Sequence, residues 1–316
     1  MKKVITLLAL LVISAVGLFA YASTGDGNGK TVTAEPEDNN TGKAVYCLLG
    51  LDKLTYNEAK DNDLMLLAQF DHNKKEIKMV SIYNDTMMKV ENDFIKSKDA
   101  YPIDGSETVL NMFKRNLDVE CEGYGAVDYK SAIQVVDLLG SVKEIITEDK
   151  VEDINKKIKE MNEAYGYDSD EIKAGEQELD GVQAVALARA FYADDSDFER
   201  TQAHRDMIKK LVAKFIKADK ETKEEILDIA LTQIHTNMNE NDIEKIMTCL
   251  EEYTIVDDTA FPRELRQLDV NGIDRCVLAD PLDENVKALH EYFGEEDYTV
   301  PENIKKISDE LKKLEK

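Results

Sequence analysis

The sequence predicts a single α/β domain with a central mixed β-sheet and helices on both faces. Short β-type runs alternate with segments of helical periodicity over roughly 250 residues, which is the pattern of a layered α/β fold. No internal repeat is visible. Charged residues make up 33% of the chain and hydrophobic residues 43%, with no Trp, so a core beneath a charged surface is expected.

The N-terminus predicts export from the cytoplasm. Two lysines follow Met1, an uncharged apolar run covers Val4–Ala20, and Ala20-Tyr21-Ala22 offers small residues for cleavage. The length of this run lies between that of a signal peptide and that of a membrane span, so residues 1–22 are either a signal peptide or a retained anchor helix. We expect the rest of the chain to lie outside the cytoplasm, anchored at the cell membrane or secreted to the cell wall.

Folded structure is expected to begin after a linker. Residues 23–42 are rich in Thr, Gly, Asn, Asp and Glu and predict a flexible tether. The domain is then expected over residues 43–293. Its first three strands, of which the last two are joined by a turn at His72-Asn73-Lys74, are predicted at Ala44–Leu49, Leu64–Phe70 and Ile77–Ile82.

Helical spacing dominates the next part of the chain, interrupted by a strand at Gly123–Asp128. Gly140 is expected to end the second of these helices, because glycine adopts the left-handed conformation that closes a helix. The predicted helices cover Ser106–Leu117, Tyr129–Leu139, Asp149–Tyr165, Gly181–Ala190, Asp197–Lys217, 221–235 and 241–252.

The C-terminal part returns to strands before it ends in helices. Strands are predicted at Glu264–Val270 and Asp274–Leu278, and helices at Asp283–Phe293 and Pro301–Glu315. The last helix, within residues 294–316, is mostly charged. We therefore expect it to stay outside the core.

Net charge and cysteine spacing exclude some classes of function. The formal net charge of −25 argues against nucleic acid as a partner, because the phosphate backbone is itself anionic. The four cysteines are widely spaced and form no zinc-binding pattern. Cys47 lies in an apolar run and is expected in the core. Cys249 and Cys276 could pair, although their spacing does not decide it, and free thiols are expected.

The segment Asp197 to His204 is a candidate anion site. On a helix that begins near Asp197, Arg200 and His204 are four residues apart and share one face, and Arg189 ends the preceding apolar helix. Basic groups from two helices could thus converge on one phosphate. The alternative is an ordinary helix start, in which Asp197 caps the helix and Arg200 follows one turn later.

Several motifs in order resemble the LytR-CpsA-Psr family. They are Gly50-Leu51-Asp52, Asp61-Asn62-Asp63, Ser81 to Thr86, Val127-Asp128-Tyr129, Leu138-Leu139-Gly140, Gly175 through Arg189, and Asp197 to Gln202. The resemblance spans roughly residues 43 to 293. It implies an extracytoplasmic phosphotransferase that binds a polyprenyl-pyrophosphate glycolipid and attaches the glycopolymer, a teichoic acid or capsular polysaccharide, to peptidoglycan of a Gram-positive wall.

The resemblance also implies a divalent ion and a set of site residues. Mg²⁺ or Mn²⁺ is expected on Asp52 and Asp63, whose carboxylates are hard oxygen ligands, although both could be ordinary strand-end aspartates. Arg189 and Arg200 are expected to bind the phosphates and to serve in catalysis. Asp85 matches the acidic residue that follows the family's catalytic-region arginine, and the resemblance implies a catalytic role for it as well.

The main departure from the family is a loss of arginines. Asp61, Asn84 and Phe191 stand where the family usually has arginine, and His204 stands where it usually has glutamine. Asn84 and His204 are still expected to face the phosphate. Since each charge-assisted contact to an anion contributes roughly 1.5–3 kcal/mol, the loss weakens the expected site. A noncatalytic member that binds a lipid or a wall polymer is therefore the alternative.

The prenyl chain of such a substrate requires an apolar tunnel between sheet and helices. Candidate lining residues are apolar side chains at helical or strand spacing, which could equally be ordinary core. They are Tyr83, Met87, Met88, Ile133, Val136, Leu187 and Val212.

Overall fold

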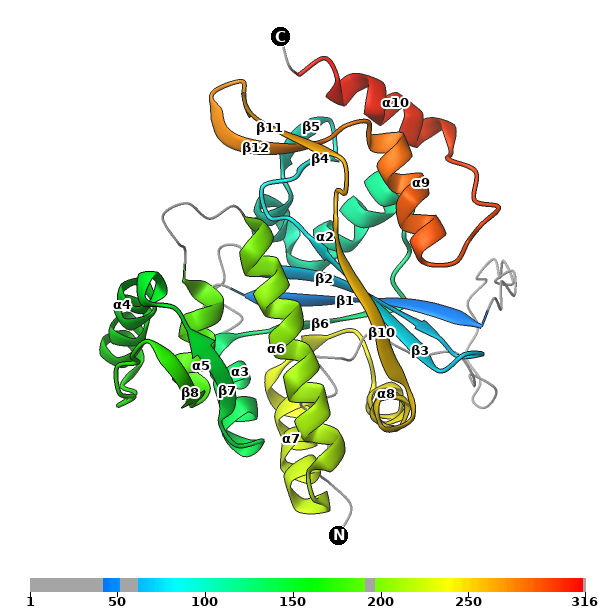
Figure 1. Ribbon diagram of the computed structural model, residues 1–316. Coiled ribbons are helices and arrows are strands. Elements are labelled where there is room, and N and C mark those ends of the chain that lie inside the picture. The colour runs from blue at the N-terminus through cyan, green and yellow to red at the C-terminus, as the bar shows by residue number, and fades with distance from the viewer. Residues whose placement is uncertain (1–41, 52–61, 191–196, 315–316) are drawn as a thin grey trace, which may run out of the picture.

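The structure of the protein, a computed structural model, describes residues 42–51, 62–190 and 197–314. Among these residues, six strands form a mixed central sheet in the order β10-β3-β2-β1-β6-β9 (Figure 1). β1 is antiparallel to β2 and parallel to β6, while β10 is parallel to β3. The strands are β1 (Lys43–Leu51), β2 (Asn62–Asp71), β3 (Glu76–Ile82), β6 (Gly123–Val127), β9 (His235–Thr236) and β10 (Thr254–Phe261).

Alternation along β1 divides the interior into two cores. Tyr46 and Leu48 point to one face of the sheet, and Cys47 and Leu49 point to the other, because successive side chains of a strand face opposite sides. All four are at most 2% exposed. The expected sheet with helices on both faces is therefore confirmed, as is the buried position of Cys47. All four cysteines of the chain lie in the described part and are free thiols.

The first core lies beneath the larger group of helices, drawn below the sheet in Figure 1. Two of these helices begin with aspartate caps: Asp128 accepts from the Ser131 N–H, and Asp180 forms a capping box with Gln183. The helices are α3 (Tyr129–Leu138), α4 (Glu148–Tyr165), α5 (Gly181–Arg189), α6 (Asp197–Lys217), α7 (Lys220–Gln233) and α8 (Glu240–Glu252).

The second core lies on the opposite face, under α2 (Tyr101–Leu117), α9 (Leu282–Tyr292) and α10 (Glu302–Leu311) (Figure 1). The expectation that the last helix stays outside the core was wrong. Ile304, Ile307 and Leu311 of α10 are at most 5% exposed and belong to this core. Although many residues of α10 are charged, its apolar residues recur at helical spacing and form a narrow stripe on one side. Such a stripe is enough to pack a helix against a core.

Two strands of the central sheet and two separate strand pairs have no counterpart in the sequence expectations. β9 and β10 belong to the central sheet, whereas β4 (Met87–Val90) with β5 (Asp93–Lys96) and β7 (Val142–Ile146) with β8 (Gly175–Leu179) form separate two-stranded pairs. β8 reads Gly-Glu-Gln-Glu-Leu and carries no apolar alternation. The two strands expected after the helices form the hairpin of β11 (Leu265–Val270) and β12 (Ile273–Ala279), which lies outside the central sheet.

The predicted N-terminal signal or anchor helix and most of the predicted linker, residues 1–41, lie outside the described residues. No helix in the described part of the chain is long and apolar enough to cross a membrane.

Candidate functional site

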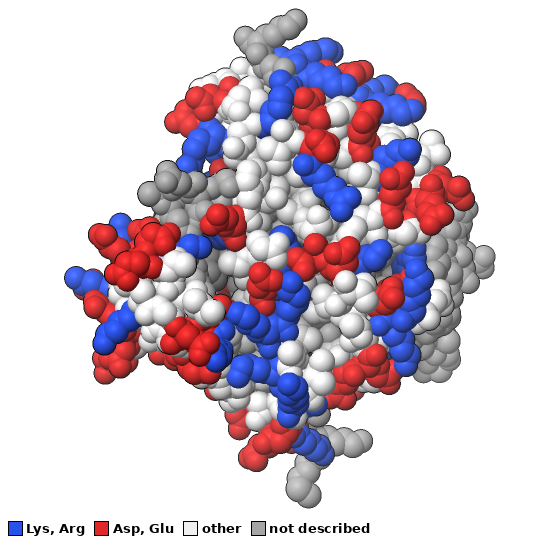
Figure 2. Space-filling view, in the orientation of Figure 1, with Lys and Arg blue, Asp and Glu red and all other residues white. Residues whose placement is uncertain are grey.

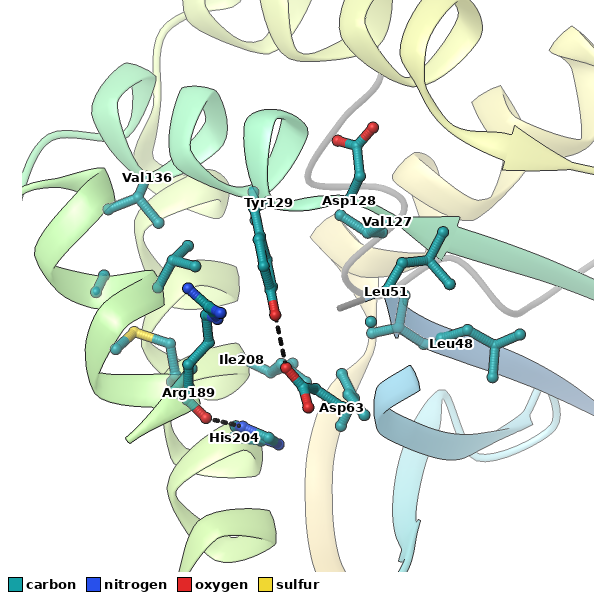
Figure 3. Close-up of a pocket in the computed structure, with 18 of the residues that line it drawn as sticks. Leu48, Leu51, Asp63, Val127, Asp128, Tyr129, Val136, Arg189, His204 and Ile208 are labelled. Atoms are coloured by element: carbon teal, nitrogen blue, oxygen red, sulfur yellow. Dashed lines mark hydrogen bonds between the residues drawn. The ribbon is translucent and has the colours of Figure 1, made fainter. Parts of the chain in front are cut away.

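A pocket of about 120 Å³ opens between the ends of β1 and β2, α3, α5 and α6 (Figure 3). We call it the α5–α6 pocket. Its interior is apolar, and its polar end carries Asp63, Tyr129, Arg189 and His204. The lining residues are Leu48, Leu49, Gly50, Leu51, Asp63, Leu64, Val127, Asp128, Tyr129, Ala132, Val136, Ala184, Val185, Ala188, Arg189, His204, Met207, Ile208 and Leu211.

Local sequence positions the walls of this pocket. Gly50 lies where the β1–β2 register shifts, and a Cβ atom there would come within 2.9 Å of the Leu64 Cβ. Gly181 allows α5 to approach α3, because an added Cβ would lie 2.4 Å from the Ile133 carbonyl oxygen. Glycine at these two positions therefore brings the strands and helices close enough to enclose the pocket.

Three strand and helix ends supply the polar end (Figure 3). The Tyr129 hydroxyl donates to the Asp63 carboxylate at 2.7 Å. The Arg189 guanidinium lies over the Tyr129 ring, with 4.3 Å from its central carbon to the ring centroid. A guanidinium can stack on an aromatic face and can bind an anion through its N–H groups. Tyr129 thus contacts Asp63 through its hydroxyl and Arg189 through its ring.

Arg200 lies next to this end, held by two carboxylates. One guanidinium nitrogen is 2.5 Å from the Asp197 carboxylate and another is 3.7 Å from that of Asp63. The Arg200 side chain is only 7% exposed. Buried charges require partners, so these contacts neutralise Arg200 in the absence of an anion.

Asn84 does not take the place of an arginine in this arrangement. Its backbone N–H donates to the Asp197 carboxylate, and its side-chain amide donates to the Asp63 carbonyl oxygen at 3.1 Å. Asn84 therefore ties the end of β3 to β2 and α6. The Asn84 side-chain oxygen has no partner among the described residues, and the expected contact of Asn84 with phosphate stays a prediction.

His204 lies four residues after Arg200 on the same helix face, as the spacing predicts. Its Nε2 is 2.8 Å from the Ala188 carbonyl oxygen, so this nitrogen carries the hydrogen. Burial and the Arg200 charge lower the pKa of His204, which favours the neutral ring. Its Nδ1 has no partner among the described residues and is then an acceptor. A neutral ring carries no positive charge, and the expected contact of His204 with phosphate stays a prediction.

Asp85 lies apart from the pocket lining. Its carboxylate is 2.9 Å from the Lys96 amine and 3.2 Å from that of Lys98. Burial opposes ionisation of Asp85, but these two lysines outweigh it and lower its pKa. The structure does not bring Asp85 to Arg189 or Arg200 in one pocket, and its catalytic role stays a prediction.

The expected metal site is only partly covered by the structure. Asp63 lies at the polar end of the pocket, whereas Asp52, Asp61 and Phe191 lie outside the described residues. Within the described ranges, no three His, Cys, Asp or Glu side chains converge as a metal site requires. Leu51, which precedes Asp52 in the chain, does line the pocket.

The seven candidate tunnel residues lie at different places in the fold, and their contact with a prenyl chain stays a prediction. Of the seven candidates, Val136 lines the pocket. Ile133 and Val212 are buried in the same core, while Met87 and Met88 belong to the core on the other face of the sheet. The sequence did not predict that Tyr129 contacts both Asp63 and Arg189. A tyrosine that follows a helix cap is expected simply to pack in the core.

Comparisons with known proteins give a consistent result. A model of the LytR_cpsA_psr family matches residues 16–291. The teichoic acid transferase TagV of Bacillus subtilis is 23% identical over 258 residues, which are 75% of this chain and 64% of TagV. The regulatory protein MsrR of Staphylococcus aureus is 24% identical over 173 residues, which are 54% of this chain and 49% of MsrR. The chain thus spans about half to two thirds of the length of these relatives.

Solved structures share the fold. TagT bound to LI-WTA has a TM-score of 0.62 at 19% identity, with 83% of this chain and 95% of that chain covered. TagT with bound octaprenyl pyrophosphate lipid has a TM-score of 0.58 at 17% identity, with 83% of this chain covered. Protein gbs0355 of Streptococcus agalactiae has a TM-score of 0.66 at 18% identity, with 83% of this chain and 90% of that chain covered.

Proposed function

The chain belongs to the LytR-CpsA-Psr family, and from that premise we propose that it transfers a glycopolymer from a polyprenyl pyrophosphate lipid to peptidoglycan. The polymer is of the teichoic acid or capsular polysaccharide class. The observation that carries the proposal is the α5–α6 pocket, whose apolar interior leads to a polar end with Asp63 and Arg189 beside Arg200. A lipid pyrophosphate has the same division into apolar tail and anionic head.

The apolar interior suits the prenyl tail. Each buried methylene of a hydrocarbon chain contributes roughly 0.8 kcal/mol, so even a few isoprene units would bind appreciably. The pocket volume of about 120 Å³ is smaller than the roughly 300–1,000 Å³ usual for small-molecule sites. Lipid entry therefore requires the walls formed by α5 and α6 to move apart.

The polar end suits the pyrophosphate. Arg189 and Arg200 present cations from two helices, and a planar guanidinium can hold two phosphate oxygens at once. Arg200 must first exchange its contacts with Asp63 and Asp197 for contacts with phosphate. Phosphate binding therefore requires Asp63 and Asp197 to lose Arg200 as their cationic partner.

A divalent ion fits this coupling. Asp63 offers a hard carboxylate ligand at the polar end, with 22% of its side chain exposed, and Asp52 would be the second ligand. When bound, Mg²⁺ would neutralise charge on the pyrophosphate oxygens. If Asp63 held a metal ion, it would no longer neutralise Arg200, and Arg200 could then bind the phosphate. The metal and the anion would then favour each other's binding.

The proposed reaction is a phosphoryl transfer. A sugar hydroxyl of peptidoglycan attacks the phosphorus that carries the glycopolymer, the bridging P–O bond breaks, and polyprenyl phosphate leaves. The hydroxyl proton passes to a base or to water. Positioning and charge neutralisation supply most of the rate enhancement in such transfers, and this chain provides Arg189 and Arg200 for that purpose.

One observation favours the alternative of a noncatalytic binding member. Arg200 carries one positive charge against the two negative charges of Asp63 and Asp197, and Asn84 adds no charge of its own. A site with this balance could bind the lipid without stabilising the transition state. In both cases we expect the domain on the outer face of the membrane, attached or exported through residues 1–22.

A transfer assay with the full chain in lipid nanodiscs tests the proposal. The donor is a radiolabelled polyprenyl-pyrophosphate disaccharide, and the acceptor is uncrosslinked peptidoglycan with Mg²⁺ present. We expect label in the peptidoglycan, with at least tenfold loss in Arg200→Ala and no loss in Arg115→Ala, an exposed arginine of α2. Lipid binding without transfer would support the noncatalytic member. Absence of lipid binding would refute the proposal.

A further inference from the structure

A second cluster of aromatic and polar side chains lies on the other side of α6 from the pocket. We call it the α6 outer track. Its aromatic members are one phenol and one phenyl ring, and its polar members are one amide, one guanidinium and one carboxylate. They are Tyr83, Phe198, Gln202, Arg205 and Asp258.

Helix geometry separates the track from the pocket. His204, Met207, Ile208 and Leu211 face the pocket. Phe198, Gln202 and Arg205 point roughly 140° away around the helix axis, since each residue advances about 100°. Phe198 and Arg200, two residues apart in the first turn of α6, also point to opposite sides of the helix. The track is therefore suited to a second substrate rather than to a continuation of the lipid.

The aromatic end of the track adjoins the polar end of the pocket. The Tyr83 and Phe198 rings pack edge to face, with centroids 4.5 Å apart and planes at 69°. Both rings are half-buried. Tyr83 directly precedes Asn84, whose N–H binds Asp197, and Asp197 holds Arg200. The aromatic pair is thus linked through Asn84 and Asp197 to Arg200 of the proposed phosphate site.

The middle of the track is a network of polar side chains whose positive and negative charges balance. Arg205 donates to the Asp258 carboxylate at 2.8 Å and to the Gln202 side-chain oxygen at 2.7 Å. Lys209 binds both Asp258 and Asp206 at 2.7 Å. Two cations thus face two carboxylates. As Figure 2 shows, blue and red side chains alternate over the face that carries α6 and β10. A polyanion gains little on such a surface.

One buried polar atom in the track lacks a partner among the described residues. It is a terminal guanidinium nitrogen of Arg205, whose side chain is 4% exposed. Orphaned buried donors are uncommon in folded proteins and suggest an external partner.

We propose that the α6 outer track binds a sugar ring of the peptidoglycan strand that accepts the transferred phosphate. A pyranose has apolar C–H faces that pack on aromatic rings and hydroxyls that pair with amide, carboxylate and guanidinium groups. The track offers both kinds of contact without net charge. The inference rests on the proposed function, since it assigns the second substrate of the same reaction.

Binding of soluble, uncrosslinked peptidoglycan glycan strands to the full chain in nanodiscs tests the track. We expect Tyr83→Ala and Gln202→Ala to weaken strand binding at least fivefold. Matched controls are Tyr167→Ala, half-buried after α4, and Gln267→Ala, exposed on β11, and neither should change binding. Gln202 is exposed, so its variant should fold even if Tyr83→Ala does not.

A second arm measures octaprenyl pyrophosphate binding in the same variants. Unchanged lipid binding together with weakened strand binding, or a raised KM for the acceptor at similar kcat, supports the track. Strand binding that is absent from the natural protein, or equal in natural protein and both variants, overturns it. Failure of the natural protein to bind lipid overturns the proposed function instead, while the strand arm still decides the track.

Discussion

A larger side chain that fills the α5–α6 pocket should weaken lipid binding while it changes the free energy of unfolding little. Ala132 lines the pocket from α3, and Ala132→Leu adds three carbon atoms, about 75 Å³, to a pocket of about 120 Å³. We expect octaprenyl pyrophosphate binding to fall at least tenfold, because the added side chain occupies most of the space that the first part of the tail would enter.

The stability of this variant should change little. Filling a cavity gains up to about 24 cal/mol per Å³, hence at most about 1.8 kcal/mol here. Strain from an imperfect fit costs about 1–3 kcal/mol, so the two effects nearly cancel. The matched control is Ala230→Leu, at a fully buried position of α7 outside the pocket lining. It meets no cavity and should destabilise by about 1–3 kcal/mol without affecting the lipid.

Urea denaturation gives the free energy of unfolding, and isothermal titration calorimetry gives the lipid affinity. The two variants should thus show opposite patterns, with lost binding in one and lost stability in the other. Lipid affinity that is unchanged in Ala132→Leu would show that the tail does not enter this pocket. The α5–α6 pocket would then no longer support the proposed function.

Three further predictions follow from the structure. Asp63→Asn should remove a Mg²⁺-dependent rise in melting temperature, because an ion that binds only the folded state stabilises it, and a surviving rise would place the ion elsewhere. Gly181→Ala should lower the free energy of unfolding by about 2 kcal/mol, measured in urea, since its Cβ would lie 2.4 Å from the Ile133 carbonyl oxygen. The His290 hydrogen bond lowers the pKa of Glu295, so ionised Glu295 stabilises the fold at neutral pH, and this contribution disappears as pH falls through its folded pKa. Glu295→Gln should therefore flatten the loss of melting temperature between about pH 5 and pH 3, and an unchanged acid profile would contradict that assignment.

Local signals located most helices and four of the six strands that the described residues place in the central sheet. The predicted helix from Asp197 to Lys217 coincides with α6, and the predicted start at Ser106 coincides with the end of a kink in α2 at Asp104 and Gly105. Such boundaries depend on caps and on side-chain periodicity within a few residues. Weak strands such as β8 carry no comparable signal and form because a partner strand is present.

The candidate site was only partly predictable. The sequence placed Arg200 and His204 on one helix face and Arg189 at the end of the preceding helix, as the structure has them. It did not indicate that Asp197 and Asp63 would share Arg200, or that Tyr129 would bind Asp63 across 66 positions in the chain. The family resemblance pointed to Asp63 as a residue of the site, but not to its partners.

The sequence by itself determined which faces of each strand and helix are apolar, where most helices begin and end, and which family the chain resembles. These properties follow from periodicity, caps and motif order, all of which are local along the chain. The tertiary structure alone decided that α10 completes the second core, that Asn84 ties strands together, and that Arg200 lies between two carboxylates. Such pairings depend on which surfaces meet after folding, and burial then makes each charge depend on the partner that the fold supplies.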